Sequence, residues 1–107
     1  MWALHAALLA EEVVPTVPAP VLAEAWRGGS RQASLVRLLA MCEVDEMTES
    51  QAKQVGVLAG RSGHTSVVDL TVVEGAIRRG DGVVTSDPRD IQRIADAARA
   101  SISIATI

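Results

Sequence analysis

Two aspartates stand where their carboxylates could act together on one ligand. Asp69 opens the helix pattern of residues 66–79, and Asp87 follows the apolar run at residues 82–86. If that run is a parallel strand feeding a helix, Asp87 lies at the carboxyl end of the strand, which is the edge where open α/β sheets bind ligands. The helix that begins near Asp69 brings that residue toward the same edge. Two carboxylates facing one point suit a hard divalent cation.

Each aspartate also has a local explanation as a helix cap. Ser66 and Asp69 have the spacing of a capping box, in which the carboxylate turns back to the first turn of its own helix. Asp87 before Pro88 fits an N-cap followed by proline at the first helical position. One detail favours function for Asp69: apolar residues follow it at spacings of three, four and seven, which places it on the apolar face. A charge on that face needs a partner or a metal.

Glu24 is a third candidate acid, because it lies in a short apolar helix pattern directly after a strand pattern. The alternative is an ordinary surface glutamate paired with Arg27 at a spacing of three, an ion pair that contributes only about 0.2–0.5 kcal/mol. Local sequence does not separate these two interpretations.

The elements that must position these acids alternate between helix and strand. Hydrophobic spacing, cap residues and glycine stops predict helices at about 2–12, 20–27, 30–40, 48–60, 66–79 and 88–99. Ser30 and Thr48 are the predicted caps of the third and fourth of these helices, and Gln51 completes a capping box with Thr48. Short β-branched or alternating runs predict strands at about 13–17, 42–47, 83–86 and 102–107. Strands separated by helices predict an α/β fold with three layers, α/β/α, around a short and mostly parallel sheet.

Bulk properties narrow the class of protein. With 107 residues, the chain is expected to form one domain, residues 1–107, with a modest core. No apolar run is long enough to span a membrane, and residues 1–10 lack the basic start and cleavage site of a signal peptide. The single cysteine, Cys42, excludes an internal disulfide and fits a reducing compartment, so we expect a cytoplasmic protein. A net charge of −3 argues against strong non-specific binding to nucleic acid.

Three segments together resemble the PIN-domain family, and particularly the bacterial VapC-like toxins. The segments are PAPVLAEAWRGG, SVVDLTVVEGA and DGVVTSDPRDI, and the resemblance extends from about Val13 to Ile104. It implies that Glu24, Asp69 and Asp87 bind Mg²⁺ or Mn²⁺ for RNA hydrolysis, with Asp90 as an accessory ligand. By the same resemblance, Thr85 or Ser86 corresponds to the hydroxyl that stands beside the last aspartate.

The sequence departs from the family pattern at its start. PIN domains begin with a strand that carries the first catalytic aspartate, whereas this sequence has no aspartate before Asp45. That strand would lie in the middle of the family's sheet, between the strands predicted near residues 13–17 and 83–86. We therefore expect a PIN-like domain truncated at its N-terminus. Its two flanking strands must pair directly, recruit another chain or leave a gap, and open strand edges favour dimerisation.

The resemblance implies a metal-dependent ribonuclease, the toxin of a toxin–antitoxin pair, with a small antitoxin and a second copy of itself as partners. Phosphodiester hydrolysis needs charge neutralisation at the phosphate and an activated water, and a carboxylate-bound cation supplies both. His64, which lies in a glycine-rich loop, is the rival candidate for a general base. Because the sequence shows no carboxylate partner for it, we expect its side chain to be solvated.

Two other interpretations remain open at the level of sequence. The first is a non-catalytic PIN remnant that dimerises or binds an antitoxin, which the absent aspartate favours. The second is an unrelated small α/β domain in which the acids are only helix caps. Substituting Asp69 or Asp87 would then lower thermal stability without changing metal affinity.

Overall fold

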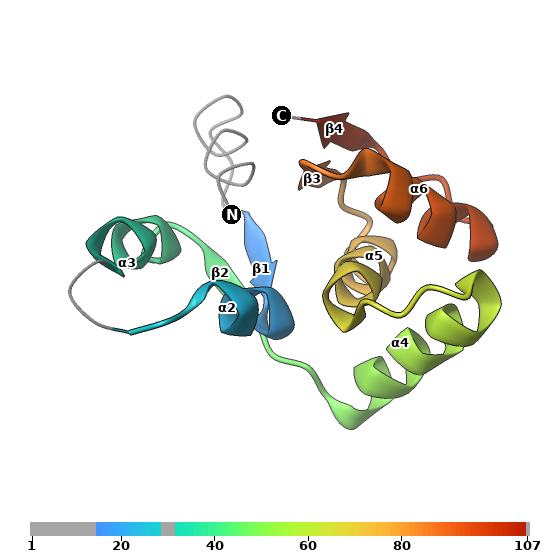
Figure 1. Ribbon diagram of the computed structural model, residues 1–107, viewed down its shortest axis with the longest axis horizontal. Coiled ribbons are helices and arrows are strands. Elements are labelled where there is room, and N and C mark those ends of the chain that lie inside the picture. The colour runs from blue at the N-terminus through green and yellow to red at the C-terminus, as the bar shows by residue number, and fades with distance from the viewer. Residues whose placement is uncertain (1–14, 29–31, 107) are drawn as a thin grey trace.

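The computed structural model describes residues 15–28 and 32–106, which form five helices and four strands (Figure 1). In chain order they are β1 (Thr16–Pro18), α2 (Ala19–Ala25), α3 (Ala33–Leu39), β2 (Glu43–Asp45), α4 (Glu49–Ser62), α5 (Val67–Arg79), β3 (Val83–Thr85), α6 (Pro88–Ala97) and β4 (Ile104–Thr106). The helix predicted at residues 2–12 and the predicted cap Ser30 lie outside the described residues. The other predicted elements are confirmed, with ends shifted by a few residues.

The strands pair in parallel, as predicted, and they do so in two separate sheets. β1 pairs with β2, with Val17 opposite Val44, and β3 pairs with β4, with Val83 opposite Ile104. The α/β class with parallel pairing is confirmed, and helices flanking short parallel sheets agree with a three-layer arrangement. Within residues 15–28 and 32–106, however, no ladder joins β1 to β3, so of the three alternatives for these flanking strands direct pairing is not observed.

Helix α5 is the central element of the molecule (Figure 1). It packs against α2, α4 and α6 and contacts both β1 and β3, so both sheets adjoin the same helix. Its residues Leu70 and Val73 are fully buried at a spacing of three. Ile91 and Ile94 on α6 repeat that spacing and are equally buried. The core formed by α4, α5, α6 and β3 therefore fixes the first turns of α5 and α6 relative to each other.

A pair of arginines joins β2 to the C-terminal end of α5. Arg78 donates to Asp45 at 2.6 Å and to Glu74 at 2.8 Å, and Arg79 donates to Asp45 at 2.7 Å. The hydrogen bond from Arg78 lowers the pKa of the Asp45 carboxyl below its ordinary value, and this effect outweighs partial burial of the group. The network connects segments that are far apart in the sequence.

This lowered pKa predicts an acid-dependent contribution to stability. Because the folded-state pKa of Asp45 is depressed, its contribution is present above the unfolded-state value of about 3.9 and is lost as pH falls through the folded value. We expect Asp45→Asn to reduce the free energy of unfolding by about 1 kcal/mol at pH 7. The difference from the parent chain should shrink below about pH 4. Urea titrations between pH 7 and pH 3 measure it, and exposed Glu46→Gln is the control.

Helix α4 begins with the predicted capping box. Thr48 Oγ1 accepts a hydrogen bond from the Gln51 backbone N–H at 3.2 Å, and Gln51 Oε1 accepts one from the Thr48 N–H at 3.0 Å. We expect Thr48→Ala to lower the free energy of unfolding by about 1 kcal/mol, because an orphan N–H of the first turn loses its acceptor. Ser50→Ala, an exposed site in the same turn, is the matched control, and equal effects from both variants would refute the cap's role.

Candidate metal site

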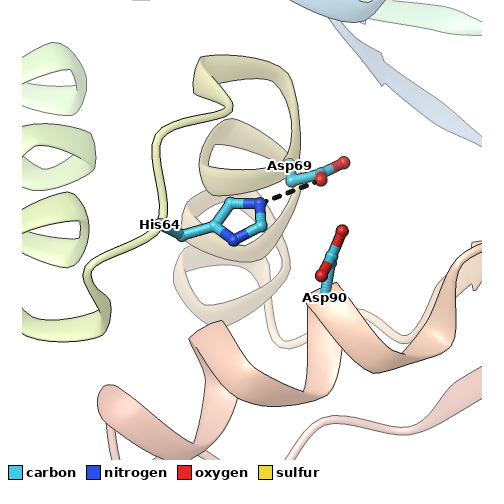
Figure 2. Close-up of side chains that lie close together, drawn as sticks. All are labelled: His64, Asp69 and Asp90. Carbon is cyan, nitrogen blue, oxygen red and sulfur yellow. Dashed lines mark hydrogen bonds and ion pairs between the residues drawn. The ribbon is translucent and has the colours of Figure 1, made fainter.

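Three side chains from separate segments meet at the N-terminal ends of α5 and α6. They are His64, Asp69 and Asp90, and one ligand atom from each lies within 4.8 Å of the others. Figure 2 shows His64 on the loop before α5, Asp69 on α5 and Asp90 on α6, with the Asp90 carboxylate pointing toward that of Asp69. The first turns of α5 and α6 therefore supply the acids, and the loop before α5 supplies the imidazole.

Local hydrogen bonds place His64 against Asp69. Gly63 ends α4 in the left-handed conformation with φ of 70°, which reverses the chain. The Ser62 hydroxyl then accepts a hydrogen bond from the His64 backbone N–H at 3.1 Å. His64 Nε2 lies 3.2 Å from Asp69 Oδ2, with the two side chains 16% and 29% exposed. The pair is therefore largely shielded from solvent.

Asp90 reaches the same point because of how α6 packs. Helix α6 begins at Pro88, which puts Asp90 in the first turn. Ile91 and Ile94 anchor that helix in the core beside α5. The Asp90 carboxylate is partly buried, and none of the described residues gives it a hydrogen bond or an ion pair. Its position is thus set by burial of the neighbouring isoleucines.

The charge around these acids is not balanced by cationic side chains. In the described part of the chain, neither Asp69 nor Asp90 has a lysine or arginine partner. Arg78 and Arg79 are engaged with other acids at the opposite end of α5. Helix dipoles at the two N-termini stabilise each carboxylate by about 0.3–1 kcal/mol. Two carboxylates this close repel each other, and a bound cation would remove that repulsion.

The capping explanations account for the backbone but not for the carboxylates. Ser66 Oγ accepts a hydrogen bond from the Asp69 backbone N–H at 3.3 Å, while the Asp69 carboxylate faces His64 instead of returning to the cap. Asp87 occupies the N-cap position of α6, yet its side chain makes no capping hydrogen bond. Its backbone N–H donates to Thr85 Oγ1 at 3.0 Å. Neither the Asp69 nor the Asp87 carboxylate caps its helix, which is the role that the local sequence alone suggests.

The structure brings together only part of the predicted ligand set. Asp69 and Asp90 converge, whereas Glu24 and Asp87 are exposed and lie outside the three-residue group. Glu24 lies on α2, which packs against α5. The ion pair with Arg27, which was the alternative interpretation, is absent from the described contacts, and Arg27 donates instead to backbone carbonyls at the end of the same helix. Of the two predicted hydroxyls, Thr85 is partly buried and Ser86 is exposed.

The expectation for His64 was wrong. We expected a solvated loop histidine without a carboxylate partner, and the side chain is instead mostly buried against Asp69. A residue two positions before an N-cap lies beside the first turn of the helix, which is the only local signal that could have indicated this contact. The turn at Gly63 and the bond to Ser62 direct the ring inward.

Comparisons of the chain with protein-family models, curated proteins and solved structures find no match. Among the helices that the structure describes, none has both the length and the apolar character required to cross a bilayer.

Proposed function

We propose that this chain is a PIN-like, metal-dependent ribonuclease of the VapC type that hydrolyses RNA phosphodiesters. The observation that supports this most is the convergence of Asp69 and Asp90, partly buried and without a lysine or arginine partner among the described residues. They lie 21 positions apart in the sequence, on two different helices. A cation bound between them would resolve the repulsion that their approach creates.

The position of the acids in the fold agrees with this proposal. Asp90 follows β3 after a short turn, so it lies beyond the carboxyl end of a parallel strand. Ligands of open α/β sheets bind at such edges. The N-termini of α5 and α6 also meet here, and the positive ends of their helix dipoles favour an anionic group such as a phosphate. A substrate phosphate and a cation would therefore be attracted to the same place.

A bound cation and the residues that hold it would supply the chemistry. A bound Mg²⁺ or Mn²⁺ would act as a Lewis acid at the phosphate and lower the pKa of an attacking water. Asp69 and Asp90 would hold that cation, and His64 Nε2 lies beside them, 3.2 Å from the Asp69 carboxylate. The resemblance adds Asp87 as a further direct or water-mediated ligand and Glu24 as a ligand or a residue that orients water, although both are exposed and lie outside the three-residue group.

The same proposal includes a second copy of the chain and a small antitoxin as partners, in the cytoplasm. Exposed large hydrophobic side chains support a protein interface on the segment from α2 to β2. They are Trp26, Val36, Met41 and Val44, each more than 40% exposed. A contiguous exposed apolar patch is typical of an interaction surface.

The test is cleavage of RNA by the purified chain with Mn²⁺ or Mg²⁺. We expect Asp90→Asn to reduce cleavage by at least about tenfold, because it removes one of the two converging charges. Asp87→Asn should have a smaller effect, since that carboxylate is exposed and outside the group. Asp96→Asn, on the exposed face of the same helix, is the control. Metal-independent cleavage, or equal effects of all three variants, would contradict the proposal.

A non-catalytic PIN-like remnant is the second candidate, and one observation favours it. Within the described residues, β1 and β3 are not paired, where the family has a central strand with a catalytic aspartate. Such a remnant would form dimers or bind an antitoxin without cutting RNA. Self-association that persists in Asp90→Asn, together with no cleavage by the parent chain in Mn²⁺, would identify it.

A further inference from the structure

We propose that His64 is a direct ligand of the cation and that its imidazole makes the site prefer a borderline transition-metal ion, such as Zn²⁺ or Co²⁺, to Mg²⁺. This inference rests on the proposed function only in placing a cation between Asp69 and Asp90. It concerns which ion is bound, and it holds or fails whether or not the chain cleaves RNA.

The first support is the separation of the donor atoms. Ligands about 2.1 Å from one cation lie about 3.0–3.4 Å from each other when they are adjacent in octahedral or tetrahedral coordination. His64 Nε2 and Asp69 Oδ2 are 3.2 Å apart, which lies within that range. The Asp90 carboxylate lies beside this pair, since all three ligand atoms are within 4.8 Å of one another. The pair is thus arranged as neighbouring ligands before any ion binds.

The second support is the orientation of the imidazole. Figure 2 shows the ring of His64 turned toward the carboxylates, with the nitrogen that faces Asp69 on the same side as Asp90. The side chain is 16% exposed, so it is held among protein atoms and loses little conformational freedom on binding. The Ser62 hydroxyl fixes the His64 backbone at 3.1 Å. The nitrogen is therefore preorganised at the point where the acids meet.

The third support is the chemistry of the donor set. Mg²⁺ prefers six oxygen ligands in nearly ideal octahedral geometry and dehydrates reluctantly. Imidazole nitrogen suits Zn²⁺ and neighbouring transition metals, which also bind more tightly in the general order of divalent affinities. One nitrogen and two carboxylates leave a coordination position open for water, which is typical of catalytic zinc centres. Two carboxylates alone would not separate these ions in this way.

The experiment is direct measurement of metal binding to the full chain. Calorimetry with Zn²⁺ and with Mg²⁺ is applied to the parent chain, to His64→Gln, and to His5→Gln, which makes the same change at the other histidine of the sequence. We expect the parent chain to bind Zn²⁺ more tightly than Mg²⁺. His64→Gln should weaken Zn²⁺ binding by at least about tenfold and leave Mg²⁺ binding nearly unchanged, while His5→Gln changes neither.

Equal weakening of Zn²⁺ and Mg²⁺ binding in His64→Gln, or no weakening of either, would overturn the inference. A second measurement uses only the parent chain, so it gives a result even if the His64→Gln variant does not fold. Added Zn²⁺ should shift the ring ¹⁵N resonance of His64 and not that of His5, and an unshifted His64 overturns the inference as well. RNA cleavage is not among these readouts, so the metal preference and the proposed function can fail independently.

Discussion

Asp69→Asn is expected to weaken divalent-metal binding, and any metal-dependent RNA cleavage, by at least about 100-fold. Loss of residues that only support metal ligands already costs 10–100-fold, and Asp69 is proposed as a ligand itself. It also contacts His64 at 3.2 Å, so the substitution disturbs two members of the three-residue group. Asparagine has the same shape as aspartate and removes only the charge. Metal titration by calorimetry and cleavage of an RNA substrate measure the effect.

Stability separates this result from unfolding. The loss of a negative charge in the first turn of α5 should cost at most about 1 kcal/mol, and relief of repulsion with Asp90 offsets part of it. Urea unfolding of Asp69→Asn should therefore resemble that of the parent chain. Destabilisation of several kcal/mol with unchanged metal affinity would instead show that Asp69 is only a cap, as in the unrelated-domain interpretation.

Arg78→Ala is expected to lower the free energy of unfolding by about 2–4 kcal/mol, the largest stability effect that we predict. Arg78 contacts Glu74 through two nitrogens and also donates to Asp45 on β2. The Glu74 side chain is 8% exposed, so removing its partner leaves a nearly buried carboxylate without the positive charge that compensates it. Since domains of this size are stable by about 5–15 kcal/mol, chemical denaturation should detect the change easily.

A double-mutant cycle shows whether the buried charge is the cause. In a Glu74→Gln background, no charge remains buried, so adding Arg78→Ala should cost much less than it does in the parent chain. Arg78→Lys should be intermediate, because it keeps the positive charge but cannot form the paired contact with Glu74. A loss below about 1 kcal/mol for Arg78→Ala would mean that the network behaves as a solvated surface ion pair.

Local sequence signals predicted most of the elements of the described chain. The capping box at Thr48 and Gln51 and the N-cap Ser66 lie where the sequence indicated them. The glycine stops at Gly63 and Gly80 adopt the left-handed conformation that ends a helix. These features depend on contacts within four or five residues, so spacing and residue type are sufficient to find them.

The sequence was less informative about the candidate site, because convergence depends on the packing of separate elements. It indicated Asp69, Asp87, Glu24 and Asp90 as candidate acids, but could not rank Asp90 above Asp87. That order follows from the rotation of α6, which burial of Ile91 and Ile94 sets against α5. Successive residues of a helix point about 100° apart around its axis, so the packing of the helix decides which acid faces the site.

The sequence by itself determined the helices and short strands, the parallel α/β class and the set of acids from which a site could be built. Only the tertiary structure decided that Asp69 meets Asp90, that His64 joins them and that the strands form two separate pairs. The physical reason is the range of the forces involved. Helix caps and turns are fixed by neighbouring residues, whereas the site depends on how one hydrophobic core orients α5, α6 and the loop between α4 and α5.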